Sequence, residues 1–155
     1  MKEQSLIRRI CGGMDAFAPH LLLTFSVMAM TFCFINLVND AMGFLTAGIS
    51  IRFQLLYYVL SVLTALVCLI ADRVRILSVL SMVLGAVLFV PAVISLAKQN
   101  TELISMPLYQ NSLLAFSFLT LLLAIVDIVV IRKKAMAEYR AAAAASDGEK
   151  EAANA

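Results

Sequence analysis

The sequence predicts an all-α integral membrane protein, with four transmembrane helices in an antiparallel bundle and both ends in the cytoplasm. Residues of the hydrophobic class make up 63% of the 155 residues, and charged residues only 14%, against roughly 45–50% and ~25% in soluble domains. A soluble chain of this length has too little interior to bury so much apolar surface. Four long apolar stretches and an uneven distribution of basic residues complete the prediction.

The four apolar stretches have the length of membrane-spanning helices. Such a helix needs about 20 mostly apolar residues, because each adds ~1.5 Å across a hydrocarbon core of about 30 Å. We expect spans at about 17–38, 53–71, 76–97 and 109–131. Helix is the predicted state because the bilayer core offers no water to backbone N–H and C=O groups. Three spans follow the first, so we expect it to be retained and not cleaved.

The basic residues predict the orientation of these spans. Ten of the twelve lysines and arginines lie in the N-terminal arm, the turn between the second and third spans, and the C-terminal arm. Positive residues favour the cytoplasmic side, so we expect these three segments on the inner face of the plasma membrane. The expected basic inner surface consists of Arg8, Arg9, Arg132, Lys133 and Lys134.

The composition divides the chain into three parts. Residues 1–15 form an N-terminal arm, residues 16–131 the transmembrane domain, and residues 132–155 a cytoplasmic tail. The first part of the tail, to about Ala145, is rich in alanine, lysine, glutamate and arginine, which are good helix formers. From Ser146 onward the composition offers nothing to bury, and we expect disorder there.

Small residues and one proline mark the expected helix contacts. Ser81 and Gly85 form a small-xxx-small pair in the third span, and Ser61 and Ala65 form another in the second. Such pairs let two membrane helices approach closely. Pro91 lies inside the third span, where it removes a backbone donor, so we expect a kink there.

Asp127 is the most informative candidate residue, because a carboxylate inside a membrane helix is expensive and often functional. It lies five residues before Arg132, near the expected inner boundary of the fourth span. One interpretation is an inner-leaflet ion pair with Arg73 or Arg75, or a hydrated carboxylate. The other is a role in binding protons or cations.

Three further polar residues each have a structural and a functional interpretation. His20 follows Pro19, a normal helix start, and we expect it at the inner interface; haem b would need a second histidine, which the chain lacks. Asn36 either ends the first span or lines an outer vestibule. Thr64 is more often an interhelical hydrogen-bond partner than a ligand. We expect no cofactor and no metal.

The sequence contains no HExxH, GxSxG, Walker or CxxC motif, so catalysis has no candidate residues. We therefore expect a non-enzymatic regulatory, accessory or scaffold subunit, acting through helix–helix association in the lipid bilayer. Its expected partner is another membrane protein or a second copy, with no direct nucleic-acid contact. The alternative is a small oligomeric transporter or channel with Asp127, Asn36 and Thr64 on a shared pathway. A membrane-embedded enzyme ranks third.

One region resembles a known family. The run Ile49-Ser50-Ile51-Arg52, then Leu55-Leu56 and a serine- and alanine-containing helix ending in Asp72-Arg73, is similar to a family of small bacterial four-span membrane proteins. That family has no assigned activity, and its genes often neighbour LytTR-type transcriptional regulators. The resemblance covers the second span and its flanks, and implies a cytoplasmic regulator as partner. The long alanine-rich tail departs from the family plan.

Overall fold

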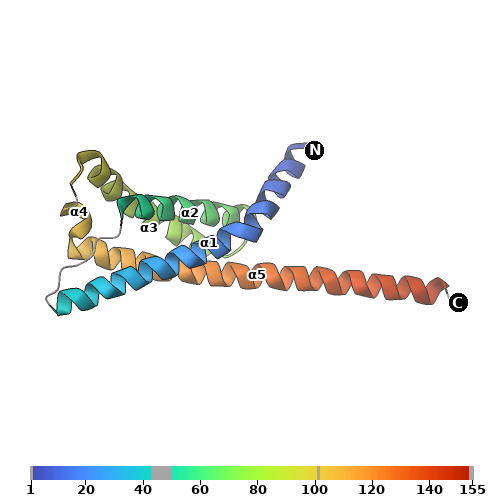
Figure 1. The fold of residues 1–155 in the computed structure, drawn as a ribbon. Helices are drawn as coiled ribbons and strands as arrows, with labels where there is room; N and C mark the ends of the chain where they lie inside the picture. Colours follow the sequence, from blue (N-terminus) through green and yellow to red (C-terminus); the bar gives the residue numbers. More distant parts are fainter. Residues whose placement is uncertain (1, 43–49, 101, 154–155) are drawn as a thin grey trace.

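The computed structural model describes residues 2–42, 50–100 and 102–153, and the side chains of 12–39, 41–42, 50–100 and 102–145. Within these ranges the chain forms helices and no strand. Four of the helices are long and apolar enough to cross a membrane, which confirms the predicted fold class at that level (Figure 1). The helices are α1 (Lys2–Ala41), α2 (Ile51–Ile70), α3 (Arg75–Lys98), α4 (Glu102–Ser105) and α5 (Pro107–Ala153).

The four long helices form a closed ring of neighbours. The most extensive contacts join α1 to α5 and α2 to α3, and smaller ones join α1 to α2 and α3 to α5. α2 and α5 therefore face each other across the centre of the ring. Aromatic rings fill this centre: the Phe116 ring of α5 lies 5.2 Å from the Tyr57 ring and 5.4 Å from the Tyr58 ring, both edge-on.

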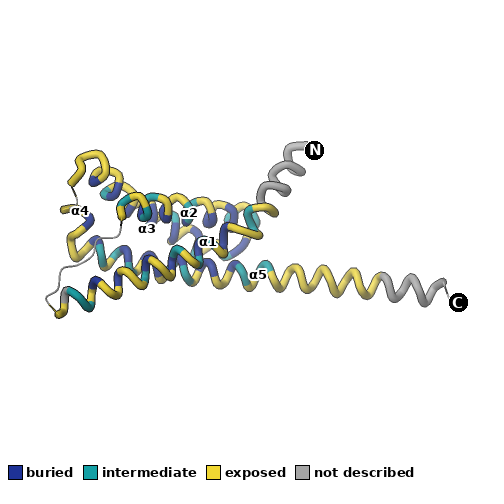
Figure 2. The backbone as a smooth tube through the Cα atoms, in the orientation of Figure 1, coloured by how far each residue is buried: buried dark blue, intermediate teal, exposed yellow. Residues whose placement is uncertain are grey.

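Large apolar side chains cover the outside of the ring, and polar groups share its interior with an apolar core. Large apolar residues are exposed on all four long helices, and Figure 2 shows exposed positions recurring along each of these helices. The buried set includes hydroxyl, amide and charged groups. Exposed apolar side chains cost nothing beside lipid tails, which are equally apolar, so this distribution suits a membrane. The buried polar and charged residues are Ser26, Asn36, Gln54, Ser61, Thr64, Arg73, Ser78, Ser81, Ser95, Ser117, Thr120 and Asp127.

The small residues singled out in the second and third spans lie at helix contacts. The Ser61 and Ser81 hydroxyls share a hydrogen bond of 2.8 Å that joins α2 to α3. Gly85 faces α5, where an added Cβ would lie 3.3 Å from the Phe116 ring. Ala65 is fully buried. The absence of bulk at these positions lets α3 approach both neighbours.

The helix containing the first span begins at Lys2 and not near Pro19, which lies inside α1. Pro19 removes one hydrogen bond, the one to the carbonyl of Asp15, and the residues before it include good helix formers, so the helix continues through it. Figure 1 shows α1 changing direction along its length, as a proline inside a helix is expected to cause. Pro91 likewise lies inside α3.

The connection between α2 and α3 is a tight, hydrogen-bonded turn. The Arg73 N–H donates to the Cys68 carbonyl at 2.7 Å, and the Asp72 N–H to the Leu69 carbonyl at 3.1 Å. Asp72 has a positive φ of 54°, so α2 ends in a Schellman motif. Val74 also has a positive φ, of 46°, an uncommon and strained conformation for a β-branched residue. The turn fixes the direction in which Arg73 points.

Helix α5 extends far beyond the other helices, and its C-terminal part lies at the same end of the molecule as the N-terminal part of α1 (Figure 1). It continues to Ala153, past Ser146, where composition predicts disorder. Alanine is the best helix former, and extending an existing helix costs far less than nucleating one. The run of alanines at 141–145 therefore carries the helix onward. The short α4, absent from the sequence-based prediction, precedes it.

Replacing Gly85 by leucine tests the contact between α3 and α5. The new side chain would overlap the Phe116 ring, and overpacking typically costs about 1–3 kcal/mol. We expect a lower free energy of unfolding in detergent, measured by circular dichroism. Gly13→Leu is the control, because nothing lies within 4 Å of a Cβ at that position. Equal effects of the two substitutions would contradict the contact.

Candidate functional site

One arginine lies between two aspartates at one end of the ring of helices. The Arg73 guanidinium contacts Asp15 of α1 through Nη2, and its Nε lies 3.3 Å from Oδ1 of Asp127 on α5. The side chains of Arg73 and Asp127 are 4% and 1% exposed, and that of Asp15 is 25% exposed. We call these three residues the Arg73 cluster. It links α1, the α2–α3 turn and α5.

Local structure explains how each member reaches the cluster. Asp127 continues the buried stripe of α5, three residues after Ala124 and seven after Thr120, a spacing that keeps side chains on one helix face. The Schellman turn directs Arg73 inward. Arg75, two residues later, points outward and pairs with Asp72, with its side chain 71% exposed. Of the two arginines considered from the sequence, the structure places Arg73 beside Asp127.

The Arg73 cluster carries an excess of negative charge, because one guanidinium faces two carboxylates. Both carboxylate oxygens of Asp127 are buried, and within the described part of the chain the hydrogen-bond donor beside them is the weak one of the Cys68 thiol. The Cys68 thiol of α2 lies beside Asp127, and Lys134 adds a more distant positive charge. Burying ions is costly unless each is well paired, so this cluster dominates the electrostatics of the interior.

A cluster of hydroxyl groups lies further along the interior. The Tyr57 hydroxyl of α2 contacts the Thr120 hydroxyl of α5 and donates to Ser26 of α1 at 3.2 Å. The Ser26 and Thr120 hydroxyls lie 2.9 Å apart. These three helices are thus joined at one level. We call Ser26, Tyr57 and Thr120 the hydroxyl cluster.

A third set of buried polar side chains lies near the start of α2, at the end of this helix away from the Arg73 cluster. The Tyr109 hydroxyl donates to the Gln54 side-chain carbonyl at 2.7 Å and lies 2.7 Å from the Tyr58 hydroxyl. All three side chains are buried. They join the start of α2 to the start of α5.

The buried face of α2 is therefore polar along its whole length. Its members recur every three or four residues, as one face of a helix requires. They form three hydrogen-bonded groups with α1, α3 and α5, and the face ends at Cys68 beside Asp127. Interhelical hydrogen bonds of this kind hold membrane helices together. The polar members of this face are Gln54, Tyr57, Tyr58, Ser61, Thr64 and Cys68.

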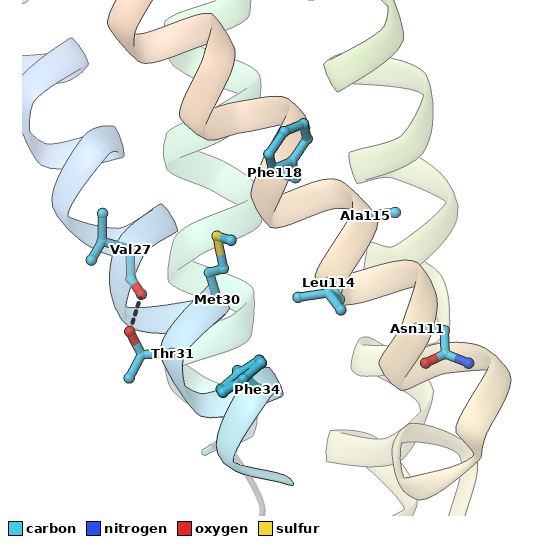
Figure 3. A pocket seen from close by; sticks show the side chains of 8 residues that line it. All are labelled: Val27, Met30, Thr31, Phe34, Asn111, Leu114, Ala115 and Phe118. Carbon is cyan, nitrogen blue, oxygen red and sulfur yellow. Dashed lines mark hydrogen bonds between the residues drawn. The ribbon is translucent and has the colours of Figure 1, made fainter. Parts of the chain in front are cut away.

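An apolar groove of about 650 Å³ opens between α1 and α5 (Figure 3). The Thr31 hydroxyl in its wall donates to the Val27 carbonyl of its own helix at 2.8 Å. The lining therefore offers few polar groups, and it favours an apolar occupant over a charged one. Its residues are Val27, Met30, Thr31, Phe34, Asn111, Leu114, Ala115 and Phe118.

The remaining residues singled out from the sequence lie apart from the Arg73 cluster. His20 is exposed. Asn36 is buried, with a side-chain oxygen that has no hydrogen-bond partner in the described ranges. The Thr64 hydroxyl donates to the Leu60 carbonyl of its own helix at 2.8 Å. The exposed basic residues after the last span are Arg132, Lys133 and Lys134, while the side chains of Arg8 and Arg9 lie outside the described ones.

Sequence reasoning missed Asp15, which it used only as the boundary of the first span. A signal was present in the sequence. Asp15 and Asp127 lie near the expected inner ends of the first and fourth spans, on the same side as the basic turn that contains Arg73. Tyr57, Tyr58 and Tyr109 lie near the expected outer ends of their spans, where aromatic residues commonly contact the membrane interface. The structure buries all three, because their hydroxyls find partners inside the ring.

No group of three histidine, cysteine, aspartate or glutamate side chains that could hold a metal ion occurs among the residues described. Comparison of the chain with family models, with characterised proteins and with solved structures gives no match.

Replacing Arg73 by glutamine tests the cluster. It leaves the buried Asp127 and the partly exposed Asp15 without their cation, and breaking a buried ion pair in this way typically costs about 3–5 kcal/mol. We expect a marked loss of stability against SDS-induced unfolding. The matched control is Arg75→Gln, which removes an exposed pair of little energetic value. The assignment fails if the Arg75 variant is the less stable of the two.

Replacing Tyr57 by phenylalanine tests the hydroxyl cluster. The ring and its packing remain, but the contacts with Ser26 and Thr120 are lost. Interhelical hydrogen bonds in membranes average about 0.6 kcal/mol, so we expect a small but measurable decrease in the free energy of unfolding. Tyr139→Phe, on the exposed part of α5, should change nothing.

Proposed function

We propose that the chain is a non-enzymatic regulatory, accessory or scaffold subunit of the plasma membrane. In this proposal the four long helices form an antiparallel bundle, both termini are cytoplasmic, and function depends on association with other helices. The observation that carries it is the continuity of α5, which runs as one helix from its apolar segment into an exposed extension.

The length of α5 supports the proposal. Its candidate membrane segment, Pro107–Ala145, has 39 residues, or about 58 Å at 1.5 Å per residue, against a hydrocarbon core of about 30 Å. The second half must therefore project from the bilayer. All residues from 132 to 145 are exposed, including Met136 and Tyr139. We call residues 132–145 the α5 extension.

The proposed mechanism follows from the position of the Arg73 cluster. Asp127 lies five residues before Arg132, so the cluster holds α5 just where the extension begins. A continuous helix transmits a displacement along its length. A partner that moves α1 or the α2–α3 turn would thus change the position of the extension. The resemblance in the second span makes a cytoplasmic regulator the favoured partner of the extension.

Photo-crosslinking in native membranes tests this proposal. A photoreactive residue at Tyr139 should yield a defined adduct with a cytoplasmic or membrane protein. One at Val87, which is exposed on α3, should report a helix partner or a second copy. The control position is Leu113, which is fully buried and should give no intermolecular product. Lipid adducts alone at every position would contradict the proposal.

Reporter fusions test the orientation. We expect a cytoplasmic reporter signal after Arg140 and an extracytoplasmic one after Gln99, because positive residues favour the inner face. The control is a fusion at Asp72, in the α2–α3 turn, which should match Arg140. If Gln99 and Arg140 report the same compartment, the antiparallel arrangement is wrong.

A small oligomeric transporter or channel is the second candidate function. The buried polar face of α2, which ends beside Asp127, supports it, because intramembrane acids often mark ion pathways. Proton flux into proteoliposomes that Asp127→Asn abolishes and Asp127→Glu retains would favour this candidate over a regulatory subunit. A membrane-embedded enzyme ranks third, and conversion of a lipid substrate by the purified protein would raise it.

A further inference from the structure

We propose that the Arg73 cluster is a proton-binding site that takes up one proton on the Asp127 carboxylate. This inference goes beyond the proposed function and does not depend on it, since both a regulatory subunit and a transporter can use such a site. It rests on the contacts, the burial and the balance of charges around one buried carboxylate.

The first support is the state of the Asp127 side chain. It is 1% exposed, and among the described side chains its oxygens meet no stronger hydrogen-bond donor than the Cys68 thiol, which is a weak one. Its charged partner, Arg73, approaches only Oδ1, at 3.3 Å from Nε. The same guanidinium is in closer contact with Asp15. Asp127 is therefore the less well-paired carboxylate.

The second support is the charge balance over every element packed around Asp127. α1 contributes the negative Asp15, the α2–α3 turn the positive Arg73, and α2 the neutral thiol of Cys68, while α3 faces that thiol with the uncharged Ser78. Lys134 of α5 is positive but exposed, so solvent screens its charge. With both aspartates ionised, the buried cluster carries one uncompensated negative charge.

A proton is the cation that fits this excess. A metal ion needs several oxygen ligands around it, and the Arg73 guanidinium already lies between the two carboxylates. A proton needs only one carboxylate oxygen, and it removes the buried charge outright. In the binding step an oxygen of Asp127 forms an O–H bond with a proton that hydronium gives up, which leaves a neutral water molecule. Asp15, 25% exposed, gives water access to the cluster.

Uptake of the proton would loosen one of the two contacts of Arg73. A neutral Asp127 no longer attracts the guanidinium as an ion, whereas Asp15 retains its charge and its contact. α5 would then be held less firmly at the point where the α5 extension begins. Protonation thus acts on the contact between α5 and the α2–α3 turn.

Infrared spectroscopy of the full-length protein in lipid bilayers tests the proposal. Ordinary carboxyl groups are ionised at neutral pH, because aspartate and glutamate have reference pKa values of about 4. The wild-type chain has ten acidic residues, yet we expect the carbonyl band of one protonated carboxyl group per chain, which shifts in deuterium oxide. The band should disappear in Asp127→Asn. It should also disappear in Asp15→Asn, because either change removes the excess charge.

The control variant is Asp72→Asn, which alters an exposed pair and should leave the band intact. If Asp127→Asn does not fold, Asp15→Asn carries the same test, with helix content measured by circular dichroism. Three results would overturn the proposal: no protonated carboxyl band in the wild type at neutral pH, a band that persists in both neutral variants, or a band that disappears when sodium replaces choline at constant pH. The last would assign the site to a metal cation.

Discussion

The packing of the four long helices depends on one buried guanidinium, that of Arg73, which lies between carboxylates from two helices. Without Arg73, Asp127 would lose the cationic group that faces it in the interior, and Asp15 would lose its partner. Because the arginine lies on the α2–α3 turn and the acids on α1 and α5, one set of contacts ties α1 and α5 to the turn that joins α2 and α3. The strained Val74 conformation is tolerated because this contact holds the turn.

The rest of the interior follows the same physical rule. Lipid provides no hydrogen bonds, so polar side chains gather inside, where many of them bond to one another or to the backbone of their own helix. The hydroxyl cluster and the Gln54–Tyr58–Tyr109 group do this at two further levels of the ring. Apolar side chains face outward, and small residues such as Gly85 set the distance between helices. Cohesion therefore comes from close packing and from internal polar contacts together.

The sequence alone predicts the four membrane-length helices, since length and hydropathy are properties of continuous segments. It also singles out Asp127, because a carboxylate inside an apolar run has an evident cost. It does not reveal Asp15 as a partner, since that pairing depends on how α1 packs against α5. The burial of Tyr57 and Tyr58 is equally invisible, because the same residues are common at membrane interfaces. The start of α1 before Pro19 is not evident either, because it depends on whether the helix propensities of the preceding residues outweigh the one backbone hydrogen bond that the proline removes.

The spacing of polar contacts on α5 also restricts its rotation about its own axis. Thr120 and Asp127 are seven residues apart, about two helical turns, and both are engaged on the same side. A turn of α5 would break both contacts at once. These contacts inside the ring therefore also determine which way each side of the α5 extension faces. At about 100° per residue, Lys134 points in nearly the same direction as Asp127, and Met136 points in the opposite direction. A partner that binds the α5 extension from a given direction would therefore always contact the same side of this helix.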